Sequence, residues 1–192
     1  MFNIKQRNLF PTDLFFVNIL DEKENNSYKE EIIKIANTEE GKVRSNRGGF
    51  QSDTLLWNNE IFKPLLEKST AVIQSIIAEY SQNRPEFVVR SMWANVNPKG
   101  GYNLTHVHPS GWMSCVYYVN VPENSSGITF EDPRPAKIMD FQQSCLRDDN
   151  YFTHQPVTGD LVIFPSWLPH FVNPNPTDDL RISISFNVEL MV

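Results

Sequence analysis

Two stretches in the first half of the chain have the three-and-four spacing of apolar residues that predicts amphipathic helices. The first covers residues 28–38, and Ser27 can cap its N-terminus. The second and clearer one covers residues 60–80, with Pro64 in the first turn, where proline is tolerated. Its apolar stripe is typical of a face that packs into a core rather than of a cofactor or partner site.

From residue 87 onward the pattern changes to short runs of valine, isoleucine and aromatic residues separated by turns, which predicts β-strands. An apolar and aromatic segment at residues 9–20 predicts a further strand or edge segment near the start. Two helices followed by seven or eight strands indicate a mainly β fold, a sandwich or barrel braced on one side by helices. The expected strands cover residues 87–96, 112–121, 128–134, 160–165, 170–172 and 180–191.

At 192 residues the chain is expected to form a single domain. Residues 1–84 would supply the helical support, and residues 85–192 would form the β core. Two polar stretches interrupt these elements, at residues 41–53 and 136–153. The latter is expected to be a long loop.

The stretch at residues 41–53 contains Gly48 and Gly49 but lacks the Gly-Lys-Ser/Thr of a phosphate-binding loop. We expect a surface loop, and a lid over an active site is the alternative. Its basic residues Lys42, Arg44 and Arg47 are most simply a solvated face, and the functional alternative is a basic patch that faces the substrate.

Composition and charge exclude several classes of protein. A net charge of −6 argues against a nucleic-acid partner, because phosphate binding draws on Lys and Arg. Cys115 and Cys145 alone make no disulfide framework. The start of the sequence lacks the apolar core of a signal peptide, and no run approaches the ~20 apolar residues of a membrane span. We therefore expect a cytoplasmic protein, and the apolar N-terminal segment leaves a homodimer open.

Three histidines suggest a metal site. His106 and His108 are two positions apart, so on a strand they point to the same face and form a chelating pair for a transition metal. His170 follows 62 positions after His108, beyond a predicted strand, and Arg181 lies eleven residues further on. His154, in the polar stretch, has no such partner and is expected to be structural.

These motifs, in this order and spacing, resemble the 2-oxoglutarate/Fe(II)-dependent oxygenase superfamily, and more narrowly a family of small oxygenases within it. The resemblance implies a double-stranded β-helix, the jelly-roll fold shared with cupins, packed against about two N-terminal helices. It also implies an enzyme that uses Fe(II) and 2-oxoglutarate, with hydroxylation of a small molecule or protein as the expected outcome. The residues that carry it lie at 93–97, 106–109, 114–118, 127–134, 159–166, 170 and 181–183, and the loop at 45–52 resembles the narrower family.

The resemblance also implies roles for individual residues. His106 and His170 take the two histidine ligand positions. Arg181 takes the position of the residue that binds the distal carboxylate of 2-oxoglutarate, and Ser183 supports it. Asn95 and Asn97 occupy positions comparable to two cosubstrate-contacting residues of the superfamily. Tyr102, on the approach to the metal motif, is the expected aromatic residue of the substrate pocket.

His108 departs from the superfamily pattern, because most members have Asp or Glu at that position. A site with His108 as the third ligand leaves Fe(II) with its full charge, whereas a carboxylate would neutralise one unit. The alternative is that Glu131 or Asp132 supplies the acidic ligand. Two further functions stay open, a cupin-like three-histidine dioxygenase that does not use 2-oxoglutarate and a catalytically silent metal-binding module.

Overall fold

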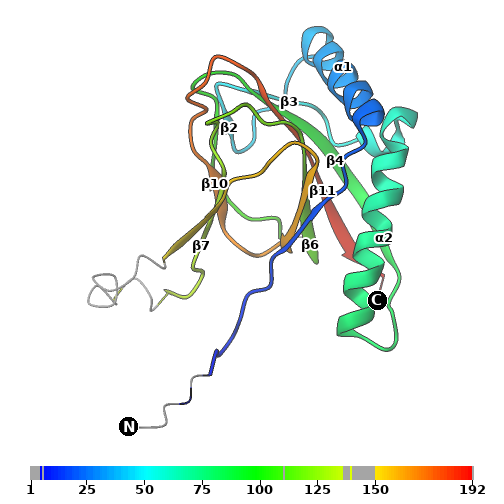
Figure 1. Cartoon of the computed structure of the whole chain (residues 1–192), viewed down its shortest axis with the longest axis vertical. Coiled ribbons are helices and arrows are strands. Elements are labelled where there is room, and N and C mark those ends of the chain that lie inside the picture. Colours follow the sequence, from blue (N-terminus) through cyan, green and yellow to red (C-terminus); the bar gives the residue numbers. More distant parts are fainter. Residues whose placement is uncertain (1–4, 6, 110, 136–138, 140–149, 192) are drawn as a thin grey trace.

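The computed structural model describes residues 5, 7–109, 111–135, 139 and 150–191. Two antiparallel sheets face each other across an interior that contains both an apolar cluster and a cavity (Figure 1). One sheet has six strands in the order β1-β9-β6-β11-β4-β3, and the other has five in the order β2-β5-β10-β7-β8. The first sheet consists of β1 (Phe15–Asn18), β3 (Phe50–Gln51), β4 (Phe87–Asn97), β6 (Met113–Asn120), β9 (Asp160–Pro165) and β11 (Arg181–Leu190). The second consists of β2 (Asn46–Arg47), β5 (Tyr102–His106), β7 (Ile128–Glu131), β8 (Tyr151–His154) and β10 (His170–Val172).

Two helices, α1 (Glu22–Thr38) and α2 (Lys63–Tyr80), cover the outer face of the six-stranded sheet (Figure 1). Apolar residues of both helices and of that sheet form one buried cluster, which excludes water from this side of the molecule. Tyr28 and Ile32 from α1 and Leu65 and Ile73 from α2 are almost fully buried in it. The predicted fold class, a mainly β double-stranded β-helix with flanking helices, is therefore confirmed.

The start of α1 was predicted wrongly. The helix begins at Glu22, six residues before the predicted start, because the Asp21 carboxylate accepts a hydrogen bond from the backbone of Glu24 at 3.0 Å. The Ser27 hydroxyl donates to the Lys23 carbonyl inside the helix instead of capping it. For α2 the prediction is close. A 3₁₀ turn over Glu60–Phe62 precedes the helix, which ends at Tyr80.

Strand β11 places alternate side chains on opposite sides of the six-stranded sheet, as the period of two requires. Four apolar side chains point toward the helices and are fully buried, and four polar ones line the interior cavity. The apolar set is Ile182, Ile184, Phe186 and Val188, and the polar set is Arg181, Ser183, Ser185 and Asn187.

The polar stretch at residues 41–53 is exposed at residues 41–44, 47 and 48, as expected of a surface loop, but it also adds to both sheets. It forms β2, which pairs with β5, and β3, which pairs with β4, each at an edge of its sheet. Asn46, Gln51 and Ser52 are buried there. Its glycines are needed for this close packing, because a Cβ on Gly49 would lie 2.8 Å from the Val96 carbonyl oxygen.

Most of the predicted loop at 136–153 lies outside the described residues. Residues 151–154 form β8, which the sequence analysis did not predict, and it pairs with β7 at the edge of the five-stranded sheet. In the described part of the chain, neither helix is long and apolar enough to cross a membrane.

Candidate active site

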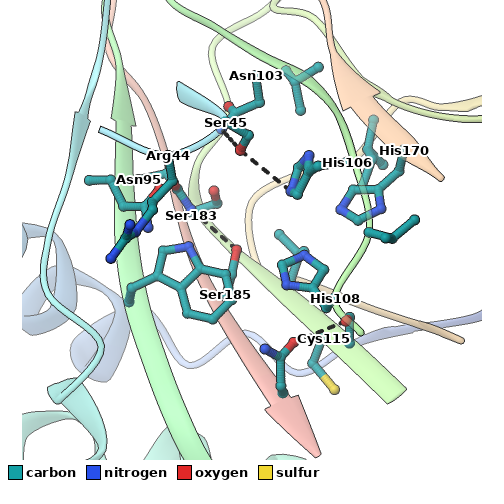
Figure 2. A pocket seen from close by; sticks show the side chains of 18 of the residues that line it. Arg44, Ser45, Asn95, Asn103, His106, His108, Cys115, His170, Ser183 and Ser185 are labelled. Carbon is teal, nitrogen blue, oxygen red and sulfur yellow. Dashed lines mark hydrogen bonds between the residues drawn. The ribbon is translucent and has the colours of Figure 1, made fainter. Parts of the chain in front are cut away.

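The three predicted histidines converge inside the double-stranded β-helix (Figure 2). His106 ends β5 and His170 begins β10, and the two residues lie directly opposite each other in the antiparallel register. His108 follows β5 in a loop that is held by a hydrogen bond from its backbone N–H to the Ser166 carbonyl at 2.8 Å. The potential ligand atoms of the three side chains all lie within 4.8 Å of one another, close enough to bind one metal ion.

The tautomers of two of these histidines are set by backbone carbonyls. Nδ1 of His106 lies 2.7 Å from the Leu104 carbonyl oxygen, and Nδ1 of His170 lies 2.9 Å from that of Leu168. A carbonyl only accepts hydrogen bonds, so each Nδ1 carries the proton and each Nε2 keeps its lone pair free for a metal. The Ser45 hydroxyl lies 3.5 Å from Nε2 of His106 and connects the β2 segment to the site.

Burial keeps the imidazoles neutral. Removal from water, together with the neighbouring His106, lowers the pKa of His108 to about 4 and that of His170 to about 3. The pKa of His106 is lowered by the same loss of water. Neutral imidazoles are the form that binds metal, so the site is ready to bind at neutral pH without losing protons first.

The described residues place no acidic side chain in this cluster. Glu131 instead accepts a hydrogen bond from the Thr105 hydroxyl, and Asp132 pairs with Arg134. Neither residue lines the cavity beside the histidines. The alternative in which one of them supplies the third ligand is therefore wrong.

Arg181 lies at one end of this cavity and is 2% exposed. Its Nε donates to the Ser126 carbonyl at 3.0 Å, and its guanidinium carbon lies 5.2 Å from the centroid of the Tyr118 ring. Burial lowers its pKa, and burial likewise raises the pKa of Tyr118 to about 12. Asp178, a carboxylate close to Arg181 in the sequence, pairs with Lys99. Among the described residues, Arg181 has no carboxylate partner, which is costly for a buried charge unless a ligand supplies one.

Two buried amide oxygens near Arg181, those of Asn95 and Asn97, also lack hydrogen-bond partners among the described residues. Asn95 lines the cavity, and its amide nitrogen donates to Ser185 at 3.2 Å. Since buried polar groups are nearly always hydrogen-bonded, the free Oδ1 of Asn95 indicates a polar ligand in this part of the cavity.

Two predicted pocket residues lie elsewhere. Tyr102 and Asn97 are not among the residues that line the cavity. Asn97 contacts the lining through its amide nitrogen, which donates to Asn103 at 3.1 Å. Asn103 and Ser45 do line it, and the sequence analysis missed both. Strand alternation would place Tyr102, not Asn103, on the face of His106, and the register irregularity between β5 and β10 changes this. Ser45 reaches the site only through the sheet topology.

Facing sheets with three histidines and a buried arginine in one cavity define a mononuclear non-haem metal oxygenase of the double-stranded β-helix type. Residues 91–187 match the family described as "Putative 2OG-Fe(II) oxygenase", and the chain belongs to this family. It is accordingly a dioxygenase whose cofactors are Fe(II) and 2-oxoglutarate. No curated protein matches the sequence.

Solved structures with the same fold are distant in sequence. The α-ketoglutarate-dependent epimerase SnoN from nogalamycin biosynthesis is 15% identical, with a TM-score of 0.72 over 92% of this chain and 77% of its own. A prolyl-4-hydroxylase of Pseudomonas putida is 17% identical, with a TM-score of 0.69 over 94% of each chain. The viral collagen prolyl hydroxylase of Paramecium Bursaria Chlorella virus-1 is 14% identical, with a TM-score of 0.63 over 93% of this chain and 96% of its own. At such identities the likeness supports the fold alone.

Proposed function

We propose that the protein is a hydroxylase in which His106, His108 and His170 hold Fe(II) and Arg181 binds the distal carboxylate of 2-oxoglutarate. The observation that carries this proposal is the buried, unpaired guanidinium of Arg181 in the cavity that contains the three neutral imidazoles. Its planar fork matches a carboxylate with two parallel hydrogen bonds. We also propose that residues 1–84 and 85–192 fold as one domain, because α1 and α2 share a single apolar cluster with the six-stranded sheet.

The residues present suit both cofactors. Fe(II) binds imidazole nitrogen atoms, and three are available here. His106 and His170 direct their Nδ1 protons to backbone carbonyls, and His108 adds a third imidazole from the loop after β5. Ser183, which is 3% exposed, and the unpartnered Oδ1 of Asn95 lie along the same wall as Arg181. When bound, iron and 2-oxoglutarate together supply the oxidising chemistry, and the chain orients them and excludes water.

The test is an anaerobic titration of the metal-free protein with Fe(II) and then 2-oxoglutarate, monitoring the visible absorption of the chelate. We expect a band in the parent protein that Arg181→Met weakens at least about tenfold in apparent affinity, because a charge-assisted bidentate contact is lost. His108→Ala should abolish the band. His154→Ala is the matched control, because His154 lies on β8, outside the cavity lining, and its loss should leave the band unchanged.

The alternatives predict different outcomes. A cupin-like dioxygenase that does not use 2-oxoglutarate would bind the metal but give no band. A silent module would give the band but no succinate once oxygen is admitted. Succinate formation that depends on both His108 and Arg181 would exclude both alternatives.

A further inference from the structure

The charges that line the cavity are all of one sign. Its described lining residues include Arg44 and Arg181 and contain no Asp or Glu. The three proposed metal ligands are neutral histidines, so Fe(II) would keep its two positive charges. One 2-oxoglutarate dianion would place one carboxylate on the metal and the other on Arg181, so one charge of Fe(II) and the charge of Arg44 would remain uncompensated. A site of this kind attracts a second anion after the cosubstrate has bound.

Arg44 differs from Arg181 in exposure. It is exposed, and it lies on the opposite side of the cavity from the histidines, together with Asn95 (Figure 2). Among the described residues, no carboxylate forms an ion pair with it. Its guanidinium is therefore free to bind a group that enters from solvent.

The backbone of Arg44 is nevertheless held firmly. Its N–H donates to Oδ1 of Asn46 at 2.8 Å, and its carbonyl accepts from Arg47 at 2.9 Å. The carbonyl of the next residue, Ser45, accepts from the backbone of Leu104 at 2.9 Å, two residues before His106. The segment that carries Arg44 is thus hydrogen-bonded to the strand that carries His106. This contact fixes the position of Arg44 relative to the proposed metal site.

We propose that the primary substrate is a small anionic molecule whose carboxylate or phosphate group binds Arg44 at the mouth of the cavity. Arg44 is then a specificity-determining residue that orients the substrate above the metal site, while Arg181 serves the cosubstrate. The cavity, about 580 Å³, is in the size range of small-molecule sites. The inference rests on the proposed function, because it requires 2-oxoglutarate to occupy the Arg181 end.

The test measures equilibrium binding to protein loaded with Mn(II) and 2-oxoglutarate under anaerobic conditions, so that no turnover is needed. The probes are matched pairs that differ in charge: benzoate and benzamide, N-acetylglycine and its amide, and glucose 6-phosphate and glucose. Comparing the two carboxylate probes with the phosphate probe shows which of the two anionic groups Arg44 prefers. We expect the tightest-binding anion to exceed its neutral partner by about 10- to 100-fold, as expected for a charge-assisted hydrogen-bond pair.

Arg44→Gln should remove this preference, and Arg44→Lys should retain part of it, because a lysine keeps the charge but loses the fork. Lys42→Gln is the matched control. It removes one positive charge from the same segment, and Lys42 does not line the cavity. Anion affinity in the Lys42 variant should stay within about twofold of the parent, as expected for a screened surface charge.

The proposal is wrong if no anion binds more tightly than its neutral partner, or if the Arg44 and Lys42 variants weaken anion binding equally. Affinity for 2-oxoglutarate should be unchanged in Arg44→Gln, since Arg181 provides that contact. If the parent protein does not bind 2-oxoglutarate, the proposed function is wrong. If it binds 2-oxoglutarate but shows no preference for anions, only the proposal for Arg44 is wrong.

Discussion

The two faces of the six-stranded sheet differ in what they contribute. Toward the helices, β11 presents Ile182, Ile184 and Phe186, all fully buried among other apolar side chains. Toward the cavity, the same strand presents Arg181, Ser183, Ser185 and Asn187. One strand thus supplies both the packing that stabilises the fold and the polar groups that can bind ligands, and the alternation of side chains keeps the two tasks apart.

The cavity face is poorly optimised for stability. It contains a buried guanidinium without a carboxylate and buried polar atoms without hydrogen-bond partners among the described residues. Such groups destabilise a folded protein unless a ligand satisfies them. We therefore expect substitutions on the helix-facing side of the six-stranded sheet to reduce the free energy of unfolding. Substitutions on its cavity-facing side should reduce ligand binding instead.

The largest effect is expected for Phe186→Ala. The ring is fully buried between the helices and the sheet, and deleting a buried phenylalanine ring typically costs about 3–5 kcal/mol of unfolding free energy. Urea unfolding of the metal-free protein measures this cost. Ser185→Ala, one residue away on the cavity face, should cost only about 1 kcal/mol, from the lost hydrogen bond with Asn95. Equal losses in the two variants would contradict the comparison.

A smaller effect is expected for a buried polar contact on the helix face. Asn25 of α1 donates to the Val119 carbonyl at 3.0 Å and accepts from the Tyr117 hydroxyl at 3.0 Å. Asn25→Ala leaves both groups buried without a partner and should cost about 1–3 kcal/mol. Tyr117→Phe should lower the free energy of unfolding less in the Asn25→Ala background than in the parent protein. Strictly additive losses in this double-mutant cycle would show that the hydrogen bond between Tyr117 and Asn25 is not formed.

Mild acid should destabilise the metal-free protein gradually. The folded-state pKa values of His108 and His170 are lowered to about 4 and about 3, below the ~6.5 of an unfolded histidine. The unfolded chain therefore binds more protons as the pH falls, and stability that is present above about pH 6.5 is lost below it. Between pH 7 and 6 the two groups should together cost about 1 kcal/mol. The urea midpoint should depend less steeply on pH in His108→Gln than in the parent protein. An identical slope would contradict the lowered pKa of His108 in the folded protein.

The smallest effect on stability is expected for Arg181→Met. The substitution removes a hydrogen bond to the Ser126 carbonyl but also removes a buried, unpaired charge, so the unfolding free energy should change by less than about 1 kcal/mol or should rise. The same variant should bind 2-oxoglutarate at least about tenfold more weakly than the parent. A large loss of stability in the metal-free protein would indicate that Arg181 has a structural role instead.

The sequence was sufficient for the features that depend on local periodicity. It predicted α2 and the long strands, because these follow from spacings of two or of three and four residues. From the order and spacing of His106, His108 and His170, it also predicted that they form one metal site. It failed where remote contacts decide the outcome. The strands at Asn46 and Phe50 exist only because β5 and β4 lie beside them, and Tyr102 lies outside the cavity lining whereas Asn103 lies within it.

The direct pairing of His106 with His170 has a consequence for folding. In an antiparallel pair, a slip of one residue turns every side chain of the moving strand to the opposite face. A slip between β5 and β10 would separate the two imidazoles, so only the native register offers both to a single ion. A bound metal ion would thus favour correctly aligned strands over misaligned ones, because binding stabilises only the state that presents the complete ligand set. In this protein the ion would help to assemble the five-stranded sheet that later holds it in place.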